Sequence, residues 1–440
     1  MNDKVKLGLT FFPAFDWKIS DTHPERQERL LYTRDQLTEE GLLDHPAVRE
    51  FRPHVATREE VEAVHVVAPS FDTWVTDAHR VSAGGAMAAA DAVMTGRAER
   101  AFALVRPPGH HAMRMVHGIR GFCSINIEAV MIAHLRRTYG THRIAVIDTD
   151  VHHGDGTQEI FYHDPDTLFI SLHQDGRTLY PGTGFQDEFG GPQAIGSNIN
   201  IPLPPGTGDE EIMKVLNEIV LPILADFKPD IVINSAGQDN HFSDPLADMR
   251  VTAKGYARLT DALKADIAVL EGGYSVEAAL PYVNTAVVLA MAGLDYDKVI
   301  EPAADSEKLR SSAAVRKSVD GLLLDWQARW ANRHAYAEAA RTSESYKATK
   351  RSIYYDETGI TEWQTERIRM RRDGLGWRSI RSTVAAGPFG RQDVQVVFIP
   401  RQASASCRSE GRDEALKIKR TGDVERVVVL DELSGIQERI

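Results

Sequence analysis

The chain has few cysteines, no long apolar run and no excess of positive charge. Two cysteines in 440 residues, Cys123 and Cys407, exclude a disulfide framework and a cysteine-rich zinc module. No window reaches the ~20 apolar residues that a membrane-spanning helix needs, and the first residues show no cleavable signal pattern. The net charge of −12 provides no basic footprint for nucleic acid or anionic lipid. We therefore expect a cytoplasmic protein that binds neither nucleic acid nor membrane directly.

The pattern of the first 300 residues is an alternation of short, continuous apolar strands with helical segments. With 42% hydrophobic and 26% charged residues, the chain has the composition of a globular protein. This alternation predicts an α/β fold with a doubly wound, mainly parallel sheet and helices on both faces. In such sheets the functional side chains gather at the carboxyl ends of the strands.

The alternation stops near residue 300, which predicts three parts: a catalytic domain 1–300, a helical connector 301–350 and a small β-rich C-terminal unit 351–440. An apolar stripe at helical spacing between residues 315 and 330 predicts that the connector packs against a core. Strand-like runs in the unit span residues 352–355, 366–370, 394–399, 415–418 and 425–430. Dimerisation, partner docking and stabilisation are all open as the role of this unit, and a homo-oligomer is compatible with the sequence.

The central stretch of the chain is an apolar strand, residues 144–147, that runs into a cluster of carboxylates and imidazoles. Side chains in extended backbone alternate between faces, so Asp148, Asp150 and His152 point the same way. Aspartate oxygen and histidine nitrogen are ordinary ligands of a divalent ion, and a catalytic zinc takes three protein ligands and keeps one position open. The alternative is a capped strand end whose side chains satisfy loop backbone groups.

Three other predicted strands end in polar groups, and in a parallel sheet these ends converge on one rim. A Pro-Pro-Gly turn delivers His110 and His111, whose titration range suits proton transfer near neutral pH, although simple exposure is the alternative. Asp239 follows an apolar strand and is the candidate for a missing ligand, or else a helix N-cap. Tyr274 follows paired glycines, where its hydroxyl can donate to a developing oxyanion, or it is a half-buried turn residue.

Two further segments carry weaker signals. Ser171 either binds a monovalent cation or merely ends a strand. The glycine-rich loop that starts at Tyr180 lacks the lysine and the following helix of a phosphate-binding loop, which favours a pocket wall over a nucleotide site.

Together and in order, five motifs resemble those of the histone deacetylase family, more its class II and bacterial acetylpolyamine amidohydrolase branches than class I. They are Arg-Pro-Pro-Gly-His-His-Ala (106–112), Gly-Phe-Cys (121–123), Asp-x-Asp-Val-His-His-Gly-Asp-Gly-Thr-Gln (148–158), Tyr-Pro-Gly-Thr-Gly (180–184) and Leu-Glu-Gly-Gly-Tyr (270–274). The resemblance covers roughly residues 5–295 and implies the arginase/deacetylase fold. It implies zinc-dependent hydrolysis of the amide of acetyl-lysine, in a protein or peptide, to acetate and a free amine. The small-molecule alternative is an amidohydrolase of acetylated polyamines or related amines.

The resemblance also implies a role for each matching residue. The implied roles are metal binding for Asp150, His152 and Asp239; acid–base transfer for His110 and His111 with Asp148 and Asp155 as their carboxylate partners; binding of the substrate carbonyl for Tyr274; lining of the acyl-lysine tunnel for Gly121, Phe122 and Tyr180; and a structural potassium site near Asp148 and Ser171.

Two departures from the family pattern bear on the substrate and remove no catalytic group. Residues 112–120 differ from the usual segment, and Gln238 and Asn240 flank Asp239 where the family often has an aromatic and a small residue. The metal is open between zinc and iron(II), since two aspartates and one histidine accept either.

Two other function classes stay open on the sequence. A two-metal hydrolase of the arginase fold needs additional carboxylates, for which Asp244 and Asp248 are the candidates. A non-catalytic module would keep the pocket only to bind acyl groups. The complete ligand set and Tyr274 favour the enzyme.

Overall fold

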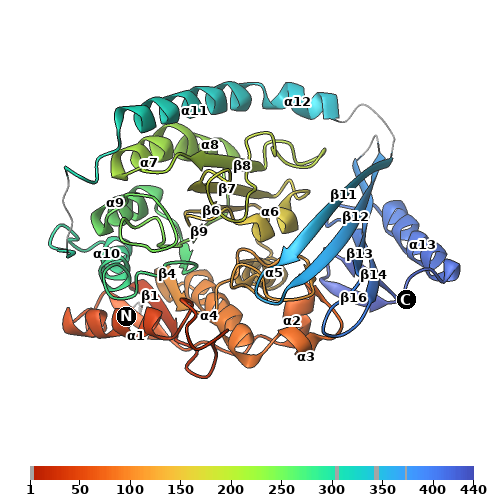
Figure 1. Cartoon of the computed structure of the whole chain (residues 1–440), viewed down its shortest axis with the longest axis horizontal. Coiled ribbons are helices and arrows are strands. Elements are labelled where there is room, and N and C mark those ends of the chain that lie inside the picture. The colour runs from red at the N-terminus through yellow and green to blue at the C-terminus, as the bar shows by residue number, and fades with distance from the viewer. Residues whose placement is uncertain (1–3, 303–306, 341–345, 372–373) are drawn as a thin grey trace.

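The main element of the fold is an eight-stranded sheet, seen in a computed structural model that describes residues 4–302, 307–340, 346–371 and 374–440 (Figure 1). The strand order is β2-β1-β4-β10-β9-β6-β7-β8, and all neighbouring strands run parallel. The strands are β1 (Val5–Phe12), β2 (Val48–Phe51), β4 (Ala98–Val105), β6 (Ile144–Asp148), β7 (Thr167–Gln174), β8 (Asn198–Leu203), β9 (Ile231–Ser235) and β10 (Ile267–Val269). A small separate sheet pairs β3 (Val66–Val67) with β5 (Met115–Val116).

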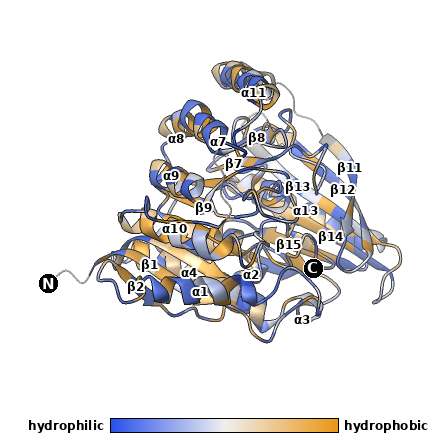
Figure 2. Cartoon of the chain, turned by 60° about the vertical axis from the view of Figure 1, so that its left-hand side comes forward, coloured by the Kyte–Doolittle hydropathy of each residue, from blue (hydrophilic) through white to orange (hydrophobic). Residues whose placement is uncertain are grey.

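Helices cover both faces of this sheet, as the sequence predicts for a doubly wound fold. In β6, Ala145 and Ile147 join one apolar core and Ile144 and Val146 the other, because successive side chains point to opposite faces. Figure 2 shows helix α4 on the second face as largely apolar. The helices are α1 (Glu28–Glu39), α2 (Arg58–Glu62), α3 (Phe71–Trp74), α4 (Asp77–Met94), α5 (Ile127–Tyr139), α6 (Asp155–Phe161), α7 (Asp209–Val215), the π-helical turn η1 (Leu216–Val220), α8 (Leu221–Phe227), α9 (Ala253–Leu263) and α10 (Leu280–Ala292).

Two helices, α11 (Ala313–Ala331) and α12 (Arg333–Ala340), follow the sheet in the predicted connector. The apolar stripe of α11 does pack against a core: Trp326 is fully buried, and its indole N–H donates to the carbonyl of Asn200 at 3.0 Å. Residues 303–306 and 341–345 of the connector lie outside the described residues. The division at residues 300 and 350 stays a prediction.

The C-terminal unit is a mixed sheet of six strands, in the order β11-β12-β13-β14-β15-β16, with one helix. Only the β14–β15 pair is parallel. The elements are β11 (Tyr346–Tyr355), β12 (Ile360–Arg371), β13 (Gly374–Val384), β14 (Gln392–Ile399), α13 (Ala405–Thr421), β15 (Arg426–Asp431) and β16 (Ile436–Arg439).

The strand predicted at residues 415–418 is wrong, because these residues lie inside helix α13. Ser404 caps the helix by accepting the N–H of Cys407, and the buried residues Cys407, Gly411 and Ala415 recur every four positions on one face. A short apolar run does not distinguish a strand from one turn of an amphipathic helix, which explains the error.

The six-stranded sheet packs directly on the catalytic domain. Its apolar side chains Val396 and Phe398 share one core with Val66 and Met115 of the small β3–β5 sheet. The opposite face of the six-stranded sheet is covered by α13, which buries Ala415 (Figure 1). The six-stranded sheet therefore lies between helix α13 and the catalytic domain.

Within the part of the chain that the structure describes, no helix combines the length and the apolar character that crossing a bilayer requires.

Candidate active site

The candidate site lies where four neighbouring strands of the large sheet end. In the order β4-β10-β9-β6, register pairs join Asp148 to Ser235 and Ser235 to Val269, so the carboxyl ends of β6, β9 and β10 are level. Four of the polar segments predicted to be functional each follow one of these strands, whereas Ser171 and the Tyr180 loop belong to β7 and its end. The topology therefore brings the segments after residues 105, 148, 235 and 269 to one edge of the sheet.

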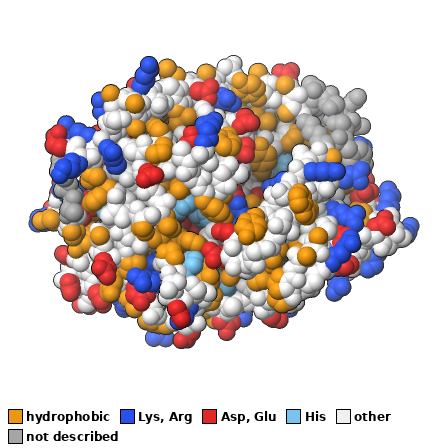
Figure 3. Space-filling model, in the orientation of Figure 1, with side chains coloured by type: hydrophobic (Ala, Val, Ile, Leu, Met, Phe, Trp, Pro, Cys, Tyr) orange, Lys and Arg blue, Asp and Glu red, His pale blue; other side chains and the backbone are white. Residues whose placement is uncertain are grey.

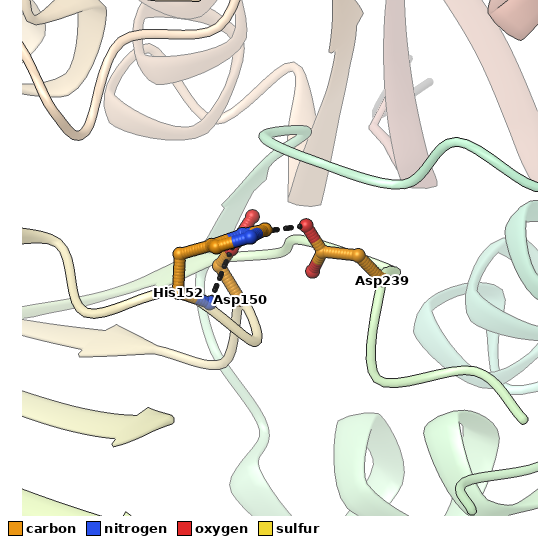
Figure 4. Close-up of side chains that lie close together, drawn as sticks. All are labelled: Asp150, His152 and Asp239. Carbon is orange, nitrogen blue, oxygen red and sulfur yellow. Dashed lines mark hydrogen bonds and ion pairs between the residues drawn. The ribbon is translucent and has the colours of Figure 1, made fainter. Parts of the chain in front are cut away.

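Asp150, His152 and Asp239 form the centre of the site (Figure 4). One potential ligand atom from each lies within 4.8 Å of the others. Nδ1 of His152 lies 3.1 Å from Oδ1 of Asp150 and 3.1 Å from Oδ2 of Asp239. All three side chains are buried. Among the described residues this is the one group of three or more histidines, cysteines or carboxylates with metal-binding geometry.

Backbone N–H groups orient the two carboxylates of this cluster. Asp150 accepts the N–H of Gly272 through Oδ2, at 2.7 Å, and Asp239 accepts the N–H of Val151 through Oδ1, at 2.9 Å. Residue 272 must be glycine, because a Cβ there would collide with the carboxylate of Asp239. The surrounding backbone therefore holds both carboxylates in fixed positions.

The electrostatics of the cluster fit a divalent cation. Burial lowers the pKa of His152, but its hydrogen bonds to Asp150 and Asp239 and the charges of these two carboxylates outweigh burial and raise it to about 10. The two buried carboxylates thus favour a positive charge between them, because buried charges are stable only when they are paired with the opposite charge. Two aspartates and one histidine are a ligand set used for zinc and for iron(II).

His110 lies against this cluster and is paired with Asp148. Its Nδ1 is 3.1 Å from Oδ2 of Asp148, and its Nε2 is 3.7 Å from Oδ1 of Asp150. Burial lowers the pKa of His110, whereas the charges of Asp150 and Asp148 raise it, and the net result lies well above 6.5. The structure therefore favours His110 as a cation held between two carboxylates.

His111 has the same kind of partner but the opposite electrostatics. Its Nδ1 lies 2.9 Å from Oδ1 of Asp155. Burial and the neighbouring charge of His110 lower the pKa of His111 to about 3, against the charge of Asp155. Asp155 is itself engaged by Arg120, whose guanidinium lies 2.6 Å from Oδ2. The pKa values of the two adjacent histidines are therefore shifted in opposite directions, upward for His110 and downward for His111.

Two buried charged side chains bind the backbone of the loop that carries Tyr274. Oδ2 of Asp244 accepts the N–H of Tyr274 at 2.7 Å, and Nε of Arg29 donates to the carbonyl of Gly273 at 2.7 Å. Burial raises the pKa of Tyr274 well above 10, so its hydroxyl keeps its proton and can donate. The engagement of Asp244 with backbone, and the exposure of Asp248, leave the two-metal alternative without a second ligand set among the described residues.

Gly121, Phe122 and Tyr180 lie between the buried cluster and the surface, each half-buried. The ring of Phe122 packs edge-on against Tyr274 with 5.3 Å between centroids. The ring of Tyr180 packs edge-on against His111 at 5.1 Å. Gly121 has a φ of +50°, and a Cβ there would strike the ring of His111. The three predicted lining residues thus contact the predicted catalytic ones.

The structure supports the predicted potassium site less than it supports the metal-binding cluster. Ser171 and Asp148 are register partners in the β6–β7 pair, and both are buried. The hydroxyl of Ser171 lies 2.8 Å from Nδ1 of His173, so it has a protein partner. The potassium site stays a prediction.

Four residues support the site in ways that the sequence did not predict, and one of them, Asp244, was a candidate only as a ligand of a second metal. Glu271 accepts the N–H groups of Gly109 and His110, at 2.7 and 3.0 Å, and so fixes the turn that delivers the histidine pair. Arg120 binds Asp155, Arg29 supports the Tyr274 loop, and Asp244 does the same. Glu271 stands inside a recognised motif, which was the available signal. Arg29 carried none, because its burial comes from packing against residues more than 240 positions away.

The sheet and the groups gathered at its edge place this chain in the class of α/β proteins with a deacetylase-type site. The sequence model described as "Histone deacetylase domain" matches residues 69–291. A "Probable deacetylase" of Archaeoglobus fulgidus is 46% identical over 323 residues, which cover 67% of this chain and 89% of that protein. The chain therefore belongs to the histone deacetylase family, as the motifs indicated, and is a hydrolase of the deacetylase type.

Two other proteins are similar to this chain over part of its length, one in sequence and one in structure. A "Histone deacetylase-like amidohydrolase" of Pseudomonas aeruginosa is 41% identical over 224 residues, 49% of this chain and 58% of that protein. The solved HD domain of HDA15 superposes with a TM-score of 0.64 at 30% identity, over 78% of this chain and 99% of that one. The fold prediction is confirmed.

Proposed function

We propose that the chain is a metal-dependent deacetylase that hydrolyses the amide of acetyl-lysine in a protein or peptide, releasing acetate and a free amine. The observation that carries this proposal is the convergence of one metal-competent cluster with two histidine–carboxylate pairs. We assign Asp150, His152 and Asp239 as the ligands. A zinc or iron(II) ion held by them supplies Lewis acidity toward the amide carbonyl and toward water.

His111 is the proposed base. Because its Nδ1–H points to Asp155, its Nε2 is the nitrogen that can accept a proton. The water oxygen attacks the carbonyl carbon as His111 takes one water proton. The C–N bond then breaks as a proton passes from the histidine pair to the amine nitrogen, which leaves acetate and the free amine.

Two other residues stabilise the charges that develop in this reaction. The Tyr274 hydroxyl, which stays protonated, donates to the oxygen of the former carbonyl as it becomes negative. The imidazolium of His110 adds a positive charge beside it and is itself neutralised by Asp148. Half-buried Phe122 and Tyr180 flank the route by which the acyl chain enters.

The test is acetate release by zinc-loaded protein from an acetyl-lysine peptide and, in parallel, from acetylated polyamines, with Tyr274→Phe as the control. Peptide turnover that the control loses supports the proposal. Turnover of polyamines alone replaces it with the small-molecule alternative. Silence on both substrates, with metal bound, overturns it and favours a non-catalytic acyl-binding module.

The proposed location is the cytoplasm. Cys123 and Cys407 are both buried and form no disulfide, as suits a reducing compartment. Cell fractionation with an antibody against the chain tests this placement, and recovery in an organelle or secreted fraction would contradict it.

A further inference from the structure

The turn between β11 and β12 reaches from the C-terminal unit to the candidate active site. Figure 1 shows these two strands crossing the front of the molecule toward its middle. The hydroxyl of Tyr355, the last residue of β11, donates to the carbonyl of Met115 at 2.8 Å and lies 2.8 Å from Glu362 of β12. This buried tyrosine anchors the hairpin to the catalytic domain immediately before the turn begins.

Asp356, the first residue of the turn, joins two of the residues proposed to line the substrate tunnel. Its Oδ1 accepts the backbone N–H of Gly121 at 3.0 Å and the hydroxyl of Tyr180 at 3.4 Å. Tyr180 packs in turn against His111. One carboxylate oxygen therefore connects two loops of the catalytic domain that carry proposed tunnel residues.

The next two residues of the turn make further contacts at the same place. Oε1 of Glu357 lies 3.4 Å from Nε2 of His23, whose ring packs edge-on against Phe122 with 4.3 Å between centroids. Thr358 lies so close to Gly118 that a Cβ on that glycine would collide with its side chain. The turn is thus fitted against the segment that leads to the tunnel residues.

The turn also brings negative charge to this entrance. Asp356 is exposed and Glu357 half-buried, whereas the nearby guanidinium of Arg120 is occupied by Asp155. Both of these hydrogen bonds fall on Oδ1 of Asp356, and Oδ2 accepts none from the residues that the structure describes. In Figure 3 acidic side chains stand beside histidines near the middle of the same face.

We propose that the β11–β12 turn is one wall of the substrate entrance, and that Asp356 is a specificity-determining residue that favours acetylated amines with a positive charge just outside the tunnel. This inference rests on the proposed deacetylase function. The charge can belong to a basic residue next to acetyl-lysine or to a second amine of an acetylated polyamine, because both present a cation to the same carboxylate. The C-terminal unit then has a role in substrate selection.

Two substitutions separate the two parts that Asp356 plays. Asp356→Asn keeps an amide oxygen that can accept from Gly121 and Tyr180 but removes the charge. Asp356→Ala removes both. Asp413→Asn is the matched control, since Asp413 is an exposed carboxylate on α13 of the same unit.

The experiment measures kcat/KM of the zinc-loaded full chain on two isosteric pairs, at low and at high salt. One pair is an acetyl-lysine tripeptide flanked by arginine or by citrulline. The other is monoacetylated 1,5-diaminopentane against N-hexylacetamide, in which a methyl group replaces the ammonium group. The unfolding midpoint of every variant is recorded so that a loss of folding is recognised.

We expect the wild-type protein to prefer the charged member of at least one pair, and the pair that responds identifies the source of the cation. Asp356→Asn lowers kcat/KM for the charged member by about fivefold, mainly through KM, and changes the neutral member by less than about twofold. High salt reduces the preference of the wild-type protein, because it screens exposed charges. Asp356→Ala also slows the neutral member, and Asp413→Asn changes neither.

Equal losses on both members of a pair in Asp356→Asn, or no preference in the wild-type protein, would overturn the inference and leave the deacetylase function standing. Absence of acetate release from all four substrates by the metal-loaded wild-type protein would overturn the proposed function and this inference with it.

Discussion

Arg120 donates to both carboxylate oxygens of Asp155, at 2.8 Å to Oδ1 and 2.6 Å to Oδ2. The same Oδ1 lies 2.9 Å from Nδ1 of His111. Burial raises the pKa of Asp155, but Arg120 and His111 together lower it well below its usual range, so the carboxylate stays ionised. The guanidinium thus orients, through one carboxylate, the imidazole that we assign as the base.

Substitution of Arg120 should therefore impair catalysis more than binding. In Arg120→Gln we expect kcat for an acetyl-lysine peptide to fall by about 10- to 100-fold with little change in KM, because the support of a histidine's partner is worth about that much. Arg120→Lys should retain part of the rate, since it keeps the charge but loses the two-pronged contact. The measurement is steady-state kinetics across pH.

The control for this prediction is Arg408→Gln, which removes another arginine–aspartate pair, with Asp431, in the C-terminal unit. It should leave kcat unchanged. A wild-type kcat in folded Arg120→Gln would show that Asp155 needs no guanidinium partner.

Removal of Asp239 tests the metal assignment. Asp239→Ala takes one carboxylate from the buried cluster, and we expect it to abolish acetate release and to lower bound metal from one ion per chain to nearly none. Elemental analysis after dialysis gives the metal content, and circular dichroism confirms the fold. Asp413→Asn should bind metal like the wild-type protein. An active, fully metallated Asp239→Ala protein would contradict the assignment of Asp239 as a metal ligand.

The hydroxyl of Tyr274 can be removed almost without a change in shape. Because burial keeps this phenol protonated, Tyr274→Phe deletes one hydrogen-bond donor and leaves the packing against Phe122 in place. Loss of a donor to a developing oxyanion typically lowers kcat by about 100-fold or more. We expect that loss in acetate release, together with unchanged metal content and unfolding midpoint. A loss confined to KM would assign Tyr274 to substrate binding alone.

The sheet and the central cluster could be predicted because both follow from local patterns. Continuous apolar strands between helices specify a parallel sheet, and polar groups after such strands must meet at its edge. Asp150 and His152 follow β6 by two and four residues, so the strand delivers them to the edge of the sheet, and the irregular segment after Asp148 sets their contact. Asp239 needed only the neighbouring strand β9.

The supporting residues could not be predicted, since their contacts depend on how distant segments pack. Arg29 lies in the first helix and meets Gly273 only in the folded protein. Asp356 belongs to a unit outside the recognised motifs, and its contact with Gly121 requires the whole six-stranded sheet to dock on the small β3–β5 sheet. Such long-range contacts have no periodic signature in the sequence.

His65 makes the stability of the protein depend on pH. It is fully buried, its Nδ1 lies 2.8 Å from the carbonyl of Met113, and its Nε2 accepts the N–H of Asn126 at 2.9 Å. Both nitrogens are therefore used by one neutral tautomer, with the proton on Nδ1. Burial lowers the pKa of His65 to about 4, against its hydrogen bond to Met113.

The sign of the effect follows from proton binding. Above pH 6.5 the ring is neutral in both states, and the folded protein has its full stability. Between pH 6.5 and 4 the unfolded chain binds a proton that the folded protein excludes, so the free energy of unfolding falls as the pH falls. The loss from this residue approaches about 3 kcal/mol below pH 4.

Urea unfolding at pH 8 and at pH 5 measures this effect. His65→Gln should be less stable than the wild-type protein at pH 8, because the two hydrogen bonds are disturbed, but it should lose less stability between the two pH values. The loss of unfolding free energy between pH 8 and pH 5 is compared in the two proteins. The difference between these losses is due to His65, because the other buried histidines titrate in both proteins. Equal losses in the two proteins would mean that the folded protein accommodates a charged His65. The neutral ring would then not be required between the carbonyl of Met113 and the N–H of Asn126.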